Sequence, residues 1–429
     1  MYMEFDITYV KALQVLDSRG NPTVEVVVIT EGGGYGRSIA PAGASRGKKE
    51  AVDLRDGGTR FFGMGVSKAV EAVNKILSSV LVGLNSSDYR HVDKKILEAD
   101  GTQNKSRIGG NACVATSLAN IKAAADTIGV PLFTFIGGFK ARLLPTPLMN
   151  IINGGAHAGN ELAFQEFMII PVGADKFSEA LRIGVEVYWS LKKFLKEKYG
   201  PSAINVGDEG GFAPPLKKVE EALEALSEAV KLAGYSLGND VLIGIDSAAS
   251  QFYDERSNKY IVDKKSLSTE ELLSMYLDLT TRYPIAYLED PFHEESPAAF
   301  GELRKSLKSK TLVVGDDLTV TREDLVTQYL RGGVIDGAII KVNQVGTYSE
   351  AEDSVRALLS NGGKAIISHR SGETEDNTIA HIAVGLETGL IKTGAPARGE
   401  RTAKYNELLR IEDYLGEEAL FAGARPLLK

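Results

Sequence analysis

The stretch IAYLEDPFHEE, residues 285–295, passes from an apolar run into charge without any polar transition. Residues 285–288 have the composition of a buried strand, and Glu289 and Asp290 follow at once, ahead of Pro291. Carboxylates at the mouth of an apolar strand are costly unless a partner compensates their charge. The stretch therefore predicts a strand whose last residues belong to a polar site.

Four further apolar runs end in the same way. They are VLIGID, TLVVGDD, GAIIK and KAIISH, and their strand-end residues are Asp246, Asp316, Lys341 and His369. From Glu289 onward these ends are 27, 25 and 28 residues apart, which leaves room for one strand, one helix and two loops each time. Apolar strands that alternate with helices indicate a parallel sheet covered on both faces. About 290 residues suit a (β/α)8 TIM-type barrel, whose active site lies at the carboxyl ends of its strands.

The first part of the chain has a different pattern. Residues 7–18, 23–30 and 35–40 alternate like strands and are joined by the turns RGNP and EGGG, which predicts a three-stranded antiparallel meander. Residues 67–84 and 109–129 then change to helical spacing, and we expect Ser67 to cap the first of these helices.

Paired glycines and a Pro-x-Pro segment interrupt the periodicity in IGGFKARLLPTP, residues 136–147. A chain of 429 residues is also long enough for two hydrophobic cores. We therefore expect an N-terminal α+β capping domain over residues 1–138 and a C-terminal barrel over residues 139–429 that carries the site.

The composition excludes several classes of protein. No run approaches the ~18–20 apolar residues of a membrane span, and the first residues lack the basic and apolar regions of a secretory signal. The net charge is −8, without a basic block that would indicate nucleic-acid binding. Cys113 is the one cysteine and cannot form an internal disulfide, as is typical of a reducing compartment. We expect a cytoplasmic protein.

The three acidic strand ends, Asp246, Glu289 and Asp316, offer only oxygen ligands. Such ligands select magnesium, manganese or calcium over zinc. The alternative is that these carboxylates pair with lysines at neighbouring strand ends and hold no metal. Nucleotide binding is disfavoured, because GMGVSK at residues 63–68 lacks the third glycine of a dinucleotide motif and no P-loop motif occurs.

The chain resembles the enolase (phosphopyruvate hydratase) family over essentially its full length. The motifs that carry the resemblance are DSRGNPT (17–23), GAS (43–45), NGGAHAG (153–159), QEFM (165–168), NVGDEGG (205–211), LEDPF (288–292), GDDLTVT (315–321), KVNQVGT (341–347), SHRSGETED (368–376) and IKTGAPARGER (391–401). The resemblance implies an enolase-type barrel whose first units are irregular. It also implies the reversible dehydration of 2-phosphoglycerate to phosphoenolpyruvate, a lyase reaction of glycolysis and gluconeogenesis.

The same resemblance implies roles for individual residues. Two Mg²⁺ ions per active site are expected with substrate bound, the first held by Asp246, Glu289 and Asp316 and the second with help from Ser45. Lys341 would be the base, and the metals and Lys392 are expected to lower its pKa. Glu209 would be the general acid, assisted by Glu166. The remaining expected substrate contacts are His157 in a lid, Gln165, His369, Arg370 and Ser371 at the phosphate, and Lys392.

Plainer interpretations remain open for single residues. The alternative for Glu209 is a place in a surface turn, the alternative for His157 is an ordinary hydrogen bond within its loop, and the alternative for His369 is a supporting role. For the whole chain the alternatives are an acid-sugar dehydratase of the same superfamily and a surface adhesin as a secondary, non-catalytic role. Glu25 and Arg410 match positions that pair across a dimer interface in the family, so a homodimer or an octamer is expected.

Overall fold

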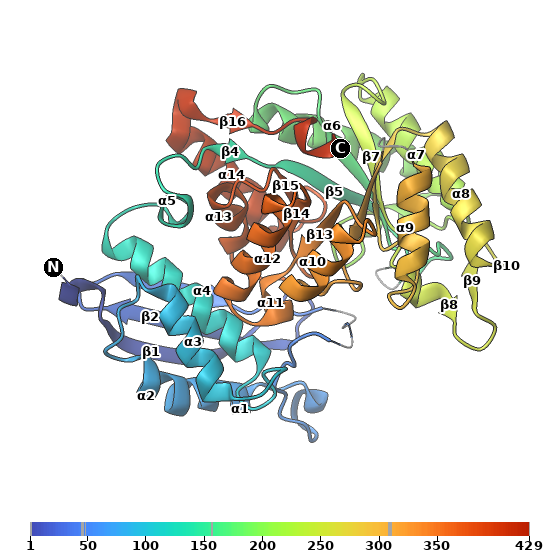
Figure 1. Ribbon diagram of the computed structural model, residues 1–429. Coiled ribbons are helices and arrows are strands. Elements are labelled where there is room, and N and C mark those ends of the chain that lie inside the picture. Colours follow the sequence, from blue (N-terminus) through green and yellow to red (C-terminus); the bar gives the residue numbers. More distant parts are fainter. Residues whose placement is uncertain (1, 44–46, 48, 156–157, 308–310, 429) are drawn as a thin grey trace.

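The computed structural model describes residues 2–43, 47, 49–155, 158–307 and 311–428. Two parts of the chain are evident in Figure 1: a smaller N-terminal part, blue to cyan, and a barrel that occupies the rest. Ser45 and His157 lie outside the described residues. Among the described helices, none combines the length and the apolar character that a membrane crossing requires.

The N-terminal part contains the predicted antiparallel meander. Strands β1 (Ile7–Leu16), β2 (Pro22–Thr30) and β3 (Tyr35–Ile39) pair in that order, and α4 (Gly110–Thr127) packs against β2 and β3. The contact is close because a side chain on Gly36 would collide with the backbone of Ala119. The remaining elements of this part are η1 (Tyr2–Phe5), η2 (Arg60–Gly63), α1 (Ser67–Ala72), η3 (Val73–Leu77), α2 (Ser78–Leu81), α3 (Tyr89–Asp100) and α5 (Leu132–Gly137).

The helix expected over residues 67–84 differs from the prediction. Its middle turn, η3, has π geometry, and the helical residues end at Leu81. The predicted cap was also wrong: Asp56, from the preceding loop, accepts hydrogen bonds from the backbone N–H groups of Ser67 and Lys68, each at 2.9 Å. A carboxylate that folds back from eleven residues upstream satisfies these first N–H groups, so Ser67 does not have to.

The second part is a closed barrel of eight strands in the order β11-β12-β13-β14-β15-β5-β6-β7. The strands are β5 (Thr146–Asn153), β6 (Glu166–Pro171), β7 (Val241–Asp246), β11 (Ile285–Glu289), β12 (Leu312–Gly315), β13 (Gly337–Ile340), β14 (Lys364–Ser368) and β15 (Leu390–Lys392). Only the two pairs that involve β6 are antiparallel; every other barrel pair is parallel. The first units of the barrel are therefore irregular, as the resemblance implies.

Helices and small sheets surround the barrel. The helices are α6 (Phe177–Tyr199), α7 (Val219–Leu232), α8 (Thr269–Arg282), α9 (Pro297–Ser306), α10 (Glu323–Arg331), α11 (Val342–Val345), α12 (Tyr348–Ser360), α13 (Thr378–Gly385) and α14 (Gly399–Leu415). The short elements are β4 (Leu143–Leu144), β8 (Tyr253–Asp254), β9 (Lys259–Val262), β10 (Lys265–Leu267), β16 (Leu420–Phe421), η5 (Pro201–Ile204), η6 (Ala249–Phe252), η7 (Gly416–Glu418) and η8 (Arg425–Leu427). Two of the cap helices, α3 and α4, lie beside α12 (Figure 1).

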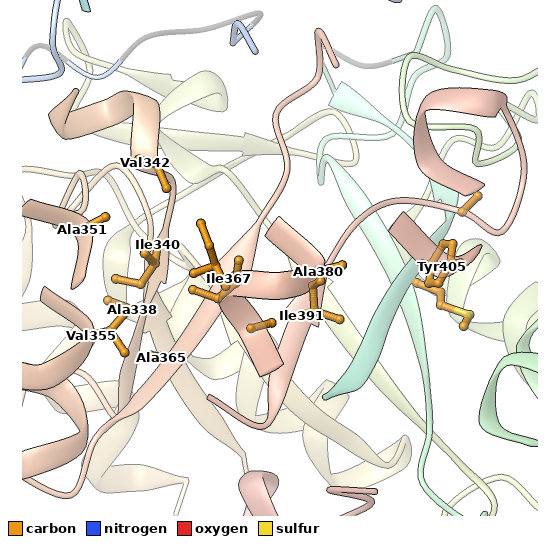
Figure 2. Packing of buried hydrophobic residues seen from close by; sticks show 14 of the residues in the cluster. Ala338, Ile340, Val342, Ala351, Val355, Ala365, Ile367, Ala380, Ile391 and Tyr405 are labelled. Carbon is orange, nitrogen blue, oxygen red and sulfur yellow. The ribbon is translucent and has the colours of Figure 1, made fainter. Parts of the chain in front are cut away.

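Alternation along the strands creates two cores. Ile340, Ile367 and Ile391 face outward and pack with residues of the surrounding helices, such as Val355 and Ala380 (Figure 2). Their sequence neighbours Ile339, Ile366 and Leu390 belong to a separate cluster inside the barrel. Burial of one such aliphatic side chain is worth ~1.5–3 kcal/mol, so the alternation fixes which residues point toward the barrel axis.

Asp376 links the N-terminal part to the barrel. Its Oδ2 accepts hydrogen bonds from the backbone N–H of Ile39, at 3.2 Å, and from Nζ of Lys122, at 3.0 Å. Burial acts to raise the pKa of Asp376, but Lys122 and hydrogen bonds from Thr378 outweigh it and hold the pKa well below its ordinary value. The ionised carboxylate thus contributes to the docking of the two parts.

We expect Asp376→Asn to lower the free energy of unfolding at pH 7 by ~1–3 kcal/mol, because it leaves Lys122 without its partner. The double variant Asp376→Asn/Lys122→Met should lose less than the sum of the two single variants. Because the folded-state pKa is depressed, the stabilisation is present above the ordinary pKa of 3.8 and is lost as the pH falls through the folded-state pKa. Chemical denaturation of the four proteins, at pH 7 and at a pH well below 3.8, measures both effects. Glu71→Gln, in an exposed pair with Lys75, is the control and should change little; an equal loss there would contradict the assignment.

Candidate functional site

Polar side chains from six barrel strands meet at the carboxyl-terminal ends of those strands. Asp246, Glu289 and Lys392 are the last residues of β7, β11 and β15. Asp316, Lys341 and His369 directly follow β12, β13 and β14. This end of a barrel is where the following loops build active sites.

A cavity of about 40 Å³ lies among these groups. The expected site residues that line it are Gln165, Glu166, Glu209, Asp246, Asp316, Lys341, His369, Arg370, Ser371 and Lys392. Gly43, Glu50, Ala248, Gln251, Asp290, Asp317 and Ser368 also line it. Glu289 is fully buried and reaches the site through Lys392. The structure thus brings together every expected site residue that it describes.

The two strand-end lysines pair with the acidic strand ends. Nζ of Lys392 lies 2.8 Å from both carboxylate oxygens of Glu289, 3.0 Å from Oδ2 of Asp246 and 3.2 Å from Oε1 of Glu166. Lys341 forms an ion pair with Oδ2 of Asp316. In this arrangement the carboxylates have the lysine partners that the sequence left open as an alternative to a metal.

The expectation of a lowered Lys341 pKa is not met in this structure. Burial of the ammonium group acts to lower the pKa, as do the like charges of Arg370 and Lys392. The ion pair with Asp316 stabilises the charged form more strongly, and the pKa of Lys341 is raised. The prediction assigned Asp316 to a metal and left its pairing with a lysine as the alternative, and it is this pairing that the structure contains.

Acidic groups nevertheless outnumber cationic groups around the cavity. Among the described lining residues, seven carry a carboxyl group and three, Lys341, Arg370 and Lys392, carry an ammonium or guanidinium group. Burial and the nearby Asp246 raise the pKa of Glu289 to about 8, although Lys392 opposes them. Burial and Glu209 raise the pKa of Glu166 well above its ordinary value. An added cation would relieve this repulsion.

The donor set fits a hard divalent cation. The candidate ligands that the structure describes, Asp246, Glu289 and Asp316, offer carboxylate oxygens, and Oε2 of Glu166 is buried with no hydrogen-bond partner among the described residues. Within the described ranges no three acidic, His or Cys side chains already form a cluster that could hold a metal. Lys341 and Lys392 form ion pairs with these carboxylates instead, so a bound metal would replace the two ammonium groups as the partner of the carboxylates.

The second carboxylate of the opening stretch, Asp290, has a structural partner. Its two oxygens accept hydrogen bonds from the backbone N–H groups of Asp316 and Asp317, each at 2.8 Å. Glu289 accepts a hydrogen bond from the hydroxyl of Tyr287 at 2.6 Å in addition to its contacts with Lys392. One carboxylate of the pair therefore faces the charged site, and the other fixes the turn that positions Asp316.

Glu209 is not part of an exposed turn. It is 2% exposed; its Oε2 accepts a hydrogen bond from Nδ2 of Asn150 at 2.9 Å, and its Oε1 lies 3.5 Å from Nε2 of His369. Gln165 donates from Nε2 to Oδ2 of Asp246 at 3.3 Å and accepts at 2.6 Å from Gln251. The side chains of Glu209 and Gln165 therefore both face the cavity.

Arg370 connects the barrel to the N-terminal part. Its Nη1 lies 3.0 Å from Oε2 of Glu50 and 3.1 Å from Oδ1 of Asn343. Gln344 bridges the same Glu50, at 3.3 Å, and Oδ1 of Asp316, at 3.2 Å. The sequence reasoning missed Glu50, Asn150 and Gln344. Glu50 lies shortly after the quoted motif GAS and Gln344 lies within KVNQVGT, but their partners are distant in the sequence.

Comparison with known proteins gives one consistent result. A family model described as "Enolase, N-terminal domain" matches residues 7–136, and one described as "Enolase, C-terminal TIM barrel domain" matches residues 141–428. A protein named enolase from Aeropyrum pernix is 53% identical over 420 residues, which is 98% of this chain and 97% of the relative.

Two further relatives agree. An enolase from Methanococcus maripaludis is 52% identical over 411 residues, covering 96% of each chain, and one from Pyrococcus furiosus is 51% identical over 421 residues, covering 98% of each. Both parts of the chain are matched, and the relatives span nearly its whole length. The chain belongs to the enolase family.

Proposed function

We propose that the cavity at the barrel mouth catalyses the reversible dehydration of 2-phosphoglycerate to phosphoenolpyruvate, the enolase reaction. The observation that carries the proposal is that one small cavity is lined by an amine, a carboxyl group and a guanidinium, those of Lys341, Glu209 and Arg370. Loss of water from this substrate needs a base for the carbon-bound proton, an acid for the departing hydroxyl and a partner for the phosphate. Membership of the enolase family supports the same reaction.

Enolases are in general magnesium-dependent. We propose that Asp246, Glu289 and Asp316 hold one Mg²⁺ ion and that Ser45, outside the described residues, helps to hold a second when substrate is bound. Ions bound there would stabilise the negative charge that develops on the substrate carboxylate when the neighbouring carbon loses its proton.

Lys341 is proposed as the base that removes the proton from C2. Lys341 can accept a proton only when its amine is neutral, and its ion pair with Asp316 disfavours the neutral form. Burial and the charges of Arg370 and Lys392 favour it. Lys341 therefore becomes a competent base when the carboxylate of Asp316 has another partner, as it would as a metal ligand.

Glu209 is proposed as the general acid that protonates the departing hydroxyl group. Glu166 assists it, because the two acids interact and the pKa of Glu166 is raised well above its ordinary value. A raised pKa keeps a proton available at this end of the cavity near neutral pH. Asn150, which donates to Glu209, holds the acid in place.

The remaining contacts would bind and orient the substrate. Arg370 and Ser371 are proposed to bind the phosphate, since a guanidinium forms paired hydrogen bonds with phosphate oxygens. Gln165, His369 and Lys392 line the cavity and would contact the rest of the substrate. His157, outside the described residues, is proposed to belong to a lid.

We also propose that the chain divides into a domain of residues 1–138 and a barrel of residues 139–429, and that it acts in the cytoplasm as a homodimer or an octamer. Within this chain Glu25 lies 3.9 Å from Arg37, and Arg410 pairs with Glu407 on α14. The support for a second subunit is that Glu25 and Arg410 match positions that pair across a dimer interface in the family. A secondary role as a surface adhesin has no support among the described residues.

The proposal predicts that purified protein converts 2-phosphoglycerate in the presence of Mg²⁺, with growth of the ultraviolet absorbance of the enolpyruvate, and that excess chelator abolishes the signal. Lys341→Ala should lose both turnover and exchange of the C2 proton with solvent deuterium, because both require the base. Glu209→Gln should lose ~10²–10⁴-fold in turnover but keep the exchange, because proton removal precedes hydroxyl departure.

Folded, magnesium-loaded protein that leaves 2-phosphoglycerate unchanged would refute this function; turnover of an unphosphorylated hydroxy acid would then identify a dehydratase. Equal loss of exchange in Lys341→Ala and Glu209→Gln would refute the division of roles between base and acid.

The metal proposal predicts that Mg²⁺ raises the Tm of the wild-type protein, by an amount equivalent to about 2.7 kcal/mol at a concentration of 100 Kd. Glu289→Gln should fold but lose most of this increase, because it removes a proposed ligand and one of the acidic groups of the site. Glu255→Gln, an exposed acid, is the control and should keep it. A wild-type Tm that is independent of Mg²⁺ would contradict the proposal.

The phosphate proposal predicts that Arg370→Lys raises KM for 2-phosphoglycerate ~10–100-fold, because a lysine cannot replace the paired hydrogen bonds of the guanidinium. Inorganic phosphate should also inhibit the variant less strongly than the wild-type protein. Arg322→Lys, in a surface pair with Asp324, should leave KM unchanged. An unchanged KM in Arg370→Lys would place the phosphate elsewhere.

A further inference from the structure

Arg401, from α14, is 0% exposed and lies behind the catalytic cavity. Its guanidinium contacts four acceptors. Nη1 donates to the backbone oxygen of Arg370 and lies against Nδ1 of His369, both at 2.6 Å, while Nη2 donates to the backbone oxygens of Ser371, at 2.6 Å, and Asp208, at 3.0 Å. One side chain therefore holds both the segment after β14 and the loop that carries Glu209.

Only one protonation state of the His369 ring is compatible with its contact with Arg401. A guanidinium has hydrogen-bond donors and no acceptor, and it does not lose its proton in proteins. Nδ1 of His369 must therefore accept with its lone pair. A neutral imidazole whose Nδ1 accepts carries its hydrogen on Nε2. This conclusion follows from the identity of the partner and needs no observed hydrogen position.

The other ring nitrogen faces the catalytic acid. Nε2 of His369 lies 3.5 Å from Oε1 of Glu209, and it has no hydrogen-bond partner among the described residues. The ring is 2% exposed and lines the cavity. An N–H on Nε2 thus points toward Glu209 and toward the space where the departing hydroxyl group would lie.

Gly394 packs closely against both Arg401 and His369. A side chain on Gly394, which has a φ of +79°, would lie 3.0 Å from Cδ of Arg401 and 3.1 Å from Cε1 of His369. Such separations are tighter than ordinary carbon contacts, so residue 394 closes the space on one side of both groups. The ring cannot turn over without losing its contact with Arg401.

We propose that Arg401 is a positioning residue that fixes His369 as the neutral Nε2–H tautomer, so that the ring serves the reaction as a hydrogen-bond donor and not as a proton carrier. The assignment of the tautomer stands on the contact with Arg401 alone. Its consequence for catalysis rests on the proposed function, in which Glu209 is the general acid.

The electrostatics around the ring agree with this role. Burial lowers the pKa of His369 to about 4, with the positive charge of Arg401 acting in the same direction, while Glu209 and Glu373 act against them. A ring that stays neutral at physiological pH carries no imidazolium proton to transfer, which agrees with the proposed role of Glu209 as the general acid.

The test is ¹⁵N NMR of the full-length protein labelled in its histidine rings, without substrate, between pH 5.5 and 8. His369→Asn identifies the resonances of His369. In the wild-type protein we expect the Nε2–H tautomer, an Nδ1 resonance typical of a hydrogen-bonded acceptor, and no titration in this range. A protonated Nδ1, or titration near the ordinary value of 6.5, would overturn the proposal.

Variants then assign the effect to Arg401. Arg401→Met should release Nδ1, give a mixture of tautomers and move the titration of His369 upward by at least about one pH unit. Arg398→Met is the matched control, because Arg398 also holds the acid loop, through the backbone oxygen of Gly207 at 3.2 Å, and the structure places no contact between it and His369. Equal spectral changes in both variants would overturn the proposal.

A folding failure of Arg401→Met does not remove the test. Arg401→Lys keeps the buried charge but loses the planar set of guanidinium N–H donors. The hydrogen-bonded Nδ1 resonance of His369 should therefore still shift in this variant. An unshifted resonance would overturn the proposal. In this variant kcat should fall ~10-fold or more with a smaller change in KM, because the Nε2–H of His369 is no longer held toward Glu209. Loss of wild-type turnover of 2-phosphoglycerate would instead refute the proposed function and leave the tautomer assignment standing, since the spectra need no substrate.

Discussion

The buried ammonium group of Lys392 is the interaction on which the barrel mouth depends. It lies within 3.2 Å of carboxylate oxygens from Glu166, Asp246 and Glu289, which come from β6, β7 and β11. At the low dielectric of this site, three carboxylates without a cation would repel one another strongly. Lys392 ends β15, which lies across the closed barrel from β11. Closing the barrel therefore brings the positive charge to the acids, so that fold and charge balance are established together.

The alternation of inward-facing and outward-facing residues that builds the two cores also determines the direction in which the acidic side chains point. On β11, Leu288 packs outward in the larger cluster, whereas Tyr287 belongs to the cluster inside the barrel. Glu289, the next residue in this alternation, lies on the inner side again, where it accepts a hydrogen bond from the hydroxyl of Tyr287 at 2.6 Å. A slip of one residue in the register of this strand would place Leu288 at the mouth and Glu289 among the helices. Apolar packing thus enforces the position of the charged site.

Sequence reasoning identified the barrel and its strand ends because each of these signals is local: an apolar run and the polar residue after it. It missed the antiparallel direction of β6, since QEFMIIP is a short apolar run without a period that reveals direction. It also missed Glu50 and the part played by Arg401, whose partners are hundreds or tens of residues away. The predicted cap at Ser67 was wrong for the same reason, because Asp56 reaches that helix only through the folded loop.

The described cations of the site already have anionic partners within the protein. Lys341 contacts Asp316, Lys392 contacts Glu289, and Arg370 contacts Glu50. Under the proposed function, a bound metal would compete for Asp316 and Glu289, and a bound phosphate would compete with Glu50 for Arg370. Binding would then exchange one set of buried ion pairs for another, which avoids leaving any charge uncompensated. An unphosphorylated acid whose only anionic group is the reacting carboxylate has no second anion to replace Glu50 at Arg370. The internal pairs themselves would therefore discriminate against unphosphorylated acids, since such a ligand would either leave Arg370 engaged with Glu50 or leave its charge buried and unpaired.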